Sequence, residues 1–529
     1  MAALAVIDEY LPVTPSLFSP ILFAGWPLLA GVLLTIAAGP AAAAPTRPNI
    51  LVLWHDGISP AAISAYGHGV VGEQTPRIDG LAATGTAMTD AYGEVTAAAA
   101  QAAFLTGRYA VRTGLAGAAA GASRGDPGLT RAQPTLARLL RALGYATGRF
   151  GLDRVGVGTA DLGFDNFYGA VLPVATSPGA PGELQLGADT GADTGANDSR
   201  LPPVLHLQRQ PDGSLQRDPV GRLDARRRAG LDAETAARAL TFIEQQQAAG
   251  RPWFVWWSAV GAQVPAEDTA AASLPATTTP LGIHDAQVGQ FLERLEQLGI
   301  AADTLVLYVG ATGIATAGAT AMLDPFDAPP ASGEGGYRVP LLVRWPARVP
   351  GGVWRNDPVH LLDALPTLLA AAGEPDLPAL LATGIALQPE GAVYRAHLDG
   401  VNQLPLLRGD AARGARQALL YWSADGLPIA LRVDDWKLTF AVPVAAAAPA
   451  WAQPLAALRA PLLVNLRQQP SGPSAFDATR ADEWRAAHGG LLAVARAHLQ
   501  ALQSSLQTFA PEAGEALAGI DWMLERLGP

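Results

Sequence analysis

The chain contains no cysteine, and Lys437 is its only lysine. Without cysteine there are no disulfides and no nucleophile derived from a thiol. Its 36 basic residues stand against 47 acidic ones, a formal net charge of −11, which argues against a nucleic-acid partner because phosphate binding needs a basic surface. With 529 residues, 49% of them hydrophobic, the chain can bury a large core. We therefore expect one large domain with a smaller appendage.

The N-terminal residues 1–46 lack any lysine or arginine, and Leu17–Gly39 is almost wholly apolar. A transmembrane helix needs about 20 such residues. The small residues Ala41–Ala44 resemble a signal-peptidase site, whereas Asp8 and Glu9 stand where a signal peptide carries basic residues. The segment predicts either a cleaved signal or a retained membrane anchor. Both place the rest of the chain outside the cytoplasm.

Short apolar runs alternate with segments of helical spacing over residues 47–417. The expected strands are Asn49–Trp54, Trp253–Ser258 and Thr304–Val309, and the expected helices are Pro134–Leu143, Ala233–Gln247 and Asp285–Leu298. This alternation predicts an α/β domain with a doubly wound, mainly parallel sheet. Functional sites of such sheets lie past the carboxyl ends of the strands, where Asp56 and Ala311 fall.

Residues 418–529 have a different pattern, with shorter strands such as Ala430–Val433 and Trp436–Phe440 and a helix-rich tail from Ala481. We expect a smaller C-terminal antiparallel-sheet subdomain with a helical tail there. The acidic insert 177–200 lacks the spacing of a calcium-binding loop and is expected to be a solvated loop.

A series of motifs in a fixed order runs from Arg47 to about Leu502. They are Arg47–Leu53 followed by Asp56, Thr75–Asp79, Leu105–Arg108, Gly163–Gly169, Tyr337–Pro346, Leu361–Thr367, Leu398–Val401 and Asp435–Leu438. Together they resemble the type I sulfatases of the alkaline phosphatase superfamily. The resemblance implies that superfamily's α/β fold and, in its active members, hydrolysis of sulfate esters.

The residues that the resemblance places in the catalytic centre differ from the family pattern. Sulfatases form a hydrated formylglycine from the cysteine of a Cys-x-Pro-Ser-Arg motif, and the matching span here is Ala97–Gln101. A cation, usually calcium, is held in the family by two aspartates and an Asp-Asn pair. Asp56 and Gly57 match the first pair, and Ala311 and Thr312 match the second. Asp56 is thus the one candidate metal ligand, and we expect no cofactor, with calcium only if a residual site exists there.

The family's cationic and acid–base groups are replaced as well. Its Lys-x-His pair matches Leu152 and Arg154, its Pro-His pair matches Ala262 and Gln263, and its sulfate-binding lysine matches Pro329. Removing one preorganised donor commonly costs about 10²–10³ in rate. We therefore assign no catalytic residue and leave the substrate-binding residues unassigned.

Four nearby residues could replace the missing groups: Thr96, Thr312, Arg154 and His55. Thr96 precedes the nucleophile position and Thr312 is the other hydroxyl near the site, but nothing in the sequence would activate either of them. Arg154 could hold an anion, although a structural or solvated arginine is favoured. His55 should point to the face opposite Asp56, because side chains alternate along a strand.

The sequence predicts a catalytically inactive sulfatase-fold protein, an extracytoplasmic binding or structural subunit with protein partners in a membrane-associated assembly. The alternative is a sulfuric or phosphoric ester hydrolase with a rebuilt active site. A third hypothesis is a small-ligand or glycan-binding module that uses aromatic residues. Its candidates are Trp54, Trp253, Trp256 and Trp257, which the strand pattern instead assigns to the core.

Overall fold

The computed structural model describes residues 47–67, 74–115, 128–130, 133–156, 162–172, 201–259, 279–312, 333–387, 392–423, 425–443, 455–468, 488–510 and 515–528. They belong to one compact unit, Arg47–Pro529. None of the helices in these ranges combines the length and apolar character needed to cross a membrane. The predicted apolar segment Leu17–Gly39 and the insert 177–200 lie outside the described residues.

The central strand of the main sheet is β1 (Asn49–His55), and all of its residues are buried. It pairs in parallel with β8 (Trp253–Ser258) on one side and with β9 (Thr304–Gly310) on the other. A parallel strand that is covered on both faces is apolar along its whole length. The three predicted strands are therefore confirmed.

The main sheet has ten strands in the order β11-β2-β10-β9-β1-β8-β4-β5-β6-β7. The remaining strands are β2 (Thr86–Met88), β4 (Ala146–Asp153), β5 (Asn166–Val171), β6 (Pro203–Arg209), β7 (Leu215–Arg222), β10 (Leu341–Arg344) and β11 (Val353–Arg355). Strands β4 and β5 continue the parallel pairing, whereas β10 is antiparallel to both of its neighbours and β6-β7 is an antiparallel hairpin at one edge. The sheet is mixed, with a parallel centre.

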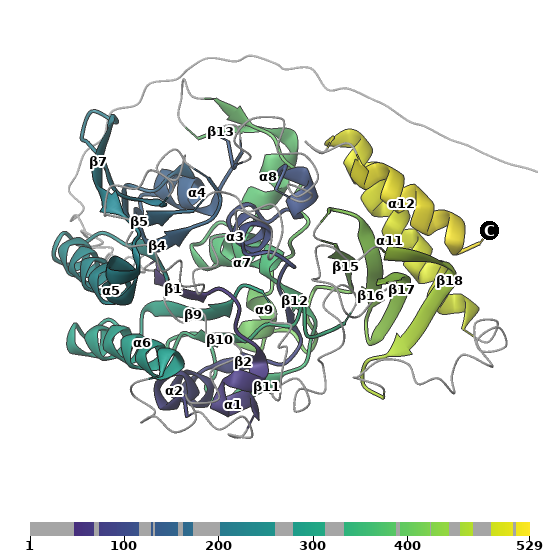
Figure 1. The fold of residues 1–529 in the computed structure, drawn as a ribbon, viewed down its shortest axis with the longest axis horizontal. Helices are drawn as coiled ribbons and strands as arrows, with labels where there is room; N and C mark the ends of the chain where they lie inside the picture. The colour runs from purple at the N-terminus through teal and green to yellow at the C-terminus, as the bar shows by residue number, and fades with distance from the viewer. Residues whose placement is uncertain are drawn as a thin grey trace, which may run out of the picture. The chain divides into compact units, whose positions relative to one another are not determined.

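Helices cover both faces of this sheet (Figure 1). One face packs against α2 (Pro76–Thr84), α5 (Ala225–Ala248) and α6 (Pro280–Gln297), and the other against α3 (Ala97–Thr106), α4 (Leu136–Ala142) and α7 (Ala364–Ala371). Alternate residues of β1 divide between these layers: Leu51 and Leu53 face the first, and Ile50, Val52 and Trp54 face the second. The doubly wound α/β fold is confirmed.

Helix α5 begins eight residues earlier than the apolar spacing indicates, at Ala225 instead of Ala233. Its N-cap is Asp224, whose side chain accepts a hydrogen bond from the backbone N–H of Arg227. Its first turn contains three consecutive arginines, Arg226, Arg227 and Arg228, so the periodicity of apolar residues does not reveal it.

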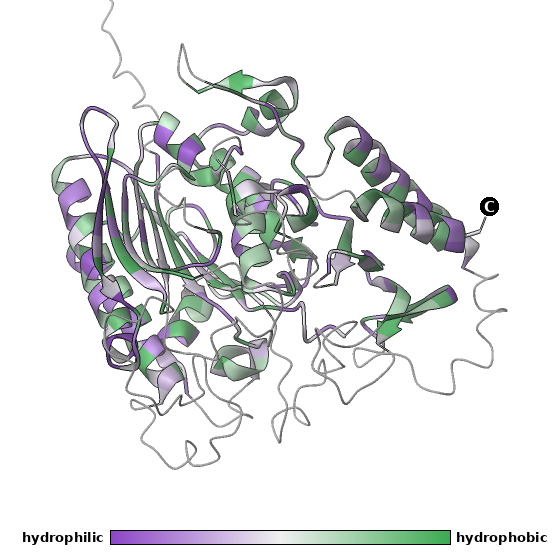
Figure 2. Ribbon diagram, turned by 45° about the horizontal axis from the view of Figure 1, so that its top comes forward, coloured by the Kyte–Doolittle hydropathy of each residue, from purple (hydrophilic) through white to green (hydrophobic). Residues whose placement is uncertain are grey.

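The C-terminal part forms a four-stranded antiparallel sheet in the order β15-β16-β17-β18. Its elements are β15 (Ala418–Trp422), β16 (Pro428–Val433), β17 (Trp436–Pro443), β18 (Leu455–Asn465), α11 (Gly489–Thr508) and α12 (Glu515–Arg526). Both helices pack on this sheet through buried residues such as Leu499, Ile520 and Met523. The predicted antiparallel sheet is confirmed, and α11 and α12 lie in the part of the chain that was expected to be helical. In Figure 2 hydrophobic residues run through the sheets, and hydrophilic residues recur along the covering helices.

Short elements complete the unit. They are α1 (Ser64–Gly67), β3 (Ala91–Tyr92), β12 (Val359–His360), α8 (Leu377–Thr383), β13 (Ile385–Ala386), β14 (Val393–Tyr394) and α9 (Leu404–Arg408).

Candidate functional site

The carboxyl ends of three strands from the parallel centre of the sheet, β9, β1 and β4, lie at the same edge, as expected for a doubly wound fold. Asp56 follows β1, Arg154 follows β4, and Ala311 follows β9. The backbone N–H of Ala311 donates to the carbonyl of His55 at 2.9 Å, which joins the ends of β9 and β1. Asp56, Arg154 and Ala311 are all buried. Two strand ends thus carry opposite charges, and the third carries a methyl group.

Both carboxylate oxygens of Asp56 accept hydrogen bonds from side chains. Trp54 Nε1 donates to Oδ1 at 2.7 Å, and Arg154 Nε donates to Oδ2 at 2.7 Å. The Asp56 and Arg154 side chains are 3% and 10% exposed, respectively, so this ion pair is almost enclosed. Asp56 is therefore part of a charge-neutral pair, and Arg154 is a buried, paired arginine and not a solvated one.

Gln101 joins α3 to the end of β4. Its Oε1 accepts a hydrogen bond from the backbone N–H of Arg154 at 3.0 Å and another from Arg149 Nη2 at 2.5 Å. The Arg149 guanidinium also lies 3.4 Å from Asp153 Oδ1 and stacks 4.9 Å above the Trp256 ring. Burial raises the pKa of Asp153 and lowers the pKa of Arg149, and each charge partly offsets the shift of the other.

The first turn of α3 contains the position that the resemblance assigns to the nucleophile. Thr96 is the N-cap, and its hydroxyl oxygen accepts a hydrogen bond from the backbone N–H of Ala99 at 3.2 Å. Ala98, Ala99 and Ala100 are buried. Alanine favours the helix and packs well, but it offers no nucleophile and no proton donor.

A calcium ion takes about six to eight oxygen ligands, and the described residues around Asp56 do not fit one. The Asp56 carboxylate is already bonded to Trp54 and Arg154, and the Asp153 carboxylate at the end of β4 is paired with Arg149. Gly57 and Ala311 have no side-chain oxygen. Among the described residues, no cluster of three or more acidic or histidine side chains could hold a metal ion.

The other sequence candidates lie away from this centre. The ring of His55 packs against His284 of α6, with the centroids 4.7 Å apart, on the opposite side of the sheet from α3. The tryptophans considered for glycan binding, Trp54, Trp253, Trp256 and Trp257, are all fully buried and present no surface for a sugar. Ala262, Gln263 and Pro329 lie outside the described residues.

Two buried ionisable residues near the site were missed by sequence reasoning. One is Arg149. The other is Glu94, which follows β3 and is 2% exposed. Burial raises the pKa of Glu94 to about 8, with a smaller contribution from the negative charge of Asp399. His360 Nε2 lies 4.0 Å from Glu94 Oε1. No local pattern distinguishes either residue from a surface charge.

Comparisons with known proteins agree with this architecture. The sequence profile of the sulfatase family matches residues 48–374. Human arylsulfatase A is 30% identical over 467 residues, which cover 83% of this chain and 85% of that protein. Bovine arylsulfatase A is 32% identical over 410 residues, which cover 74% of this chain and 73% of that protein.

Among solved structures, the PsFucS1 sulfatase from Pseudoalteromonas sp. superimposes with a TM-score of 0.65 at 22% identity, and the match covers 88% of this chain and 92% of that one. This likeness concerns the fold. The profile match and the arylsulfatase identities extend it to ancestry, because they span most of both chains. The chain therefore belongs to the sulfatase family.

Proposed function

We propose that this sulfatase-family chain does not hydrolyse esters and instead serves as a binding or structural subunit. The observation that carries the proposal is the first turn of α3. At the family's nucleophile position this helix has alanines, and the neighbouring hydroxyl of Thr96 is engaged by the N–H of Ala99. A serine or threonine hydroxyl becomes a nucleophile only beside a base or a metal.

The surrounding charges support the same proposal. Arg154 and Asp56 neutralise each other, and Gln101 is hydrogen-bonded to the backbone of Arg154 and to Arg149. Groups that stabilise a transition state must point at the position where negative charge develops. These groups point at one another, so the proposed role of this centre is to support the fold.

The proposed setting is extracytoplasmic and membrane-associated, with at least one protein partner. This part rests on the apolar run Leu17–Gly39, which would remain as an anchor or be cleaved as a signal. No nucleic-acid partner is proposed, because the net charge is −11.

The hydrolysis test uses the purified chain with a fluorogenic aryl sulfate and the matching phosphate, each in calcium and in chelator. Two relatives are named arylsulfatase A, so an aryl sulfate is the relevant probe. The proposal expects no turnover above buffer. Metal-dependent turnover that disappears in both Asp56→Ala and Thr96→Ala would overturn it and establish an ester hydrolase with a rebuilt site.

The partner test is the native mass of the tagged chain after gentle purification from its host's membranes. A stoichiometric protein partner supports a structural subunit. A solitary polypeptide that begins near Ala44 would contradict both the assembly and the anchor, and would indicate a secreted protein.

A further inference from the structure

We infer that the guanidinium of Arg154 takes the place of a divalent cation at the strand ends, so that the sulfatase fold of this chain is complete without a metal ion at Asp56. Sulfatases usually hold a calcium ion at this place, but the described residues around Asp56 do not fit one. The inference concerns metal binding and stability, so it can be tested separately from the proposed lack of hydrolysis.

The Asp56 carboxylate already has a cationic partner, the guanidinium of Arg154. Arg154 Nε lies 2.7 Å from Oδ2, and Trp54 Nε1 lies 2.7 Å from Oδ1. The buried side chains shield the pair from water, which strengthens the attraction between the charges. Charge-assisted hydrogen bonds of this length are among the stronger ones in proteins. A calcium ion would have to displace Arg154 before it could reach this carboxylate.

The Arg154 side chain reaches Asp56 from a backbone that is itself held in place. Gln101 Oε1 accepts from the Arg154 N–H, and the same oxygen accepts from Arg149, which in turn pairs with Asp153. The ends of β1 and β4 and helix α3 are thereby connected through the side chains of Asp56, Arg154, Gln101 and Arg149 and the backbone N–H of Arg154. A metal ion joins separate segments in the same way, by bringing ligands from each to one point.

The charges of this cluster also balance without a metal. Asp56 and Arg154 form one buried pair, and Asp153 and Arg149 form a second. A divalent ion added beside Arg154 would repel its guanidinium, and the described residues contain no group of three or more acidic or histidine side chains that could hold such an ion. The family's need for a bound cation at this place is therefore met by the chain itself.

The first test measures metal binding directly. Terbium is a luminescent substitute for calcium, and its emission is sensitised by a nearby indole, which Trp54 would provide. We expect no saturable terbium emission that depends on Asp56, and the same melting temperature in calcium and in chelator. Saturable emission that Asp56→Asn abolishes, or a calcium-dependent rise in melting temperature, would overturn the inference.

The second test is a double-mutant cycle of Asp56→Asn and Arg154→Met in chelator, read by urea unfolding. Each single change leaves a buried polar or charged group without its partner, so each should lower the unfolding midpoint clearly. The double variant should lose much less than the sum. Additive losses would show that Arg154 does not act on Asp56. If a single variant fails to fold, the terbium and melting tests on the unaltered chain still decide the question.

The pair Arg294–Glu244 provides a matched control. Its Nε–Oε1 distance is also 2.7 Å, but the side chains are 37% and 38% exposed. The cycle of Glu244→Gln and Arg294→Met should therefore show little coupling. Equal coupling in both cycles would mean that the Asp56 pair is an ordinary ion pair, which would contradict the inference.

The outcomes separate this inference from the proposed function. Hydrolysis that is unaffected by chelator would refute the proposed function but leave intact the inference that Arg154 takes the place of a metal ion. Terbium binding at Asp56 without any hydrolysis would refute the inference about Arg154 and leave the proposed function intact.

Discussion

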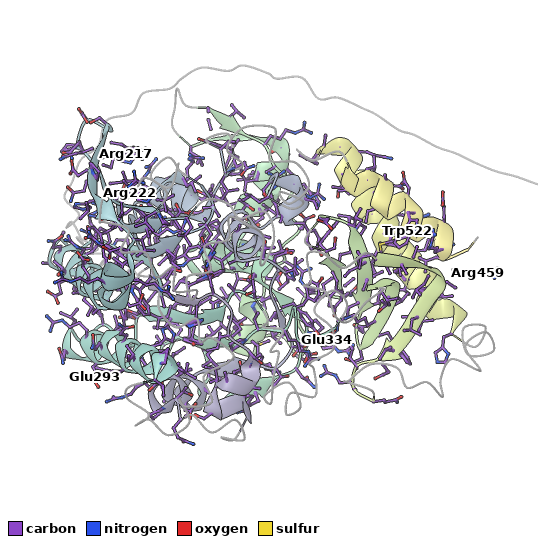
Figure 3. All side chains as sticks on the ribbon, viewed as in Figure 1. Arg217, Arg222, Glu293, Glu334, Arg459 and Trp522 are labelled. Atoms are coloured by element: carbon purple, nitrogen blue, oxygen red, sulfur yellow. The ribbon has the colours of Figure 1, made fainter. Side chains whose placement is uncertain are left out.

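Lys437, the only lysine of the chain, donates its Nζ to Glu334 Oε1 at 2.9 Å in the interior of the protein. Glu334 also accepts hydrogen bonds from the hydroxyls of Tyr92 and Tyr421 and from Arg338 Nε. Burial alone would raise the pKa of Glu334, but the Lys437 and Arg338 cations hold it well below its usual value. Figure 3 shows Glu334 between the main sheet and the C-terminal sheet. One carboxylate thus joins these two parts of the chain.

Replacing either partner of this contact should destabilise the protein. Glu334→Gln leaves the buried Lys437 ammonium without its counter-charge, and Lys437→Met leaves the carboxylate with less compensation. Breaking a buried ion pair commonly costs about 3–5 kcal/mol, and we expect losses of this order in urea unfolding. Glu293→Gln serves as the control, because its partner Arg77 forms an ion pair that is 54% exposed on both sides. That change should cost about 0.5 kcal/mol or less. Similar losses in the two variants would contradict the interpretation.

Chemical modification should report the same contact. Because Lys437 is buried and hydrogen-bonded, an amine-reactive reagent should label it slowly in the native protein and quickly in denaturant. Peptide mass spectrometry reads the labelling at this position. Fast labelling of the native chain would show that the C-terminal sheet opens readily from Glu334.

The fold could be predicted from the sequence to a large extent, because the strands β1, β8 and β9 are uninterrupted apolar runs and the family motifs fix their order. The C-terminal antiparallel sheet followed from its short strands. The antiparallel pairing of β10 with β9 could not be predicted from the sequence, because a strand's direction depends on the path of the chain between the two strands.

The candidate site was only partly predictable. The sequence identified Asp56, Gln101 and Arg154 by their places in the motifs, but it gave no sign that they are connected. Arg149 lies 48 residues from Gln101 in the sequence, and Asp56 lies 98 residues from Arg154. Hydrogen bonds over such separations follow from the packing of β1, α3 and β4, which a local pattern does not encode.

Glu94 should make the stability of the protein depend on pH. Its pKa is raised from an ordinary 4.5 to about 8 by burial. Between these values the folded state keeps a proton that the unfolded chain has released, so stability falls as the pH rises from 4.5 to 8. Each pKa unit corresponds to about 1.4 kcal/mol. Glu94→Gln removes this penalty, and its stability relative to the unaltered chain should grow by a few kcal/mol across the window.

The measurement is urea unfolding of both proteins at several pH values, with the difference between them plotted against pH. Taking the difference cancels the titrating groups that do not contact Glu94, and the pKa of the neighbouring His360, which burial lowers to about 3, lies below the window. The exposed variant Glu293→Gln should give a flat difference. A flat difference for Glu94→Gln as well would show that Glu94 is ionised and compensated in the folded state.

Gly151 should be the least replaceable residue near the site. It lies in β4 opposite Ser258 of β8, and its backbone has φ +107, a region that residues with a Cβ atom rarely adopt. A Cβ atom added there would lie 1.8 Å from the Ser258 carbonyl oxygen. Because β4 leads directly into Arg154, Gly151→Ala should both destabilise the protein by more than about 3 kcal/mol and displace the guanidinium from Asp56.

Gly80, in helix α2, is the matched control, because an added Cβ atom would meet nothing within 4 Å. Gly80→Ala should raise the stability by about 0.5–1 kcal/mol, since alanine costs less conformational entropy in a helix. Urea unfolding of the two variants should therefore give shifts of opposite sign. If Gly151→Ala folds with unchanged stability, the end of β4 can move away from β8 at little cost. The position of Arg154 beside Asp56 would then not depend on this backbone conformation.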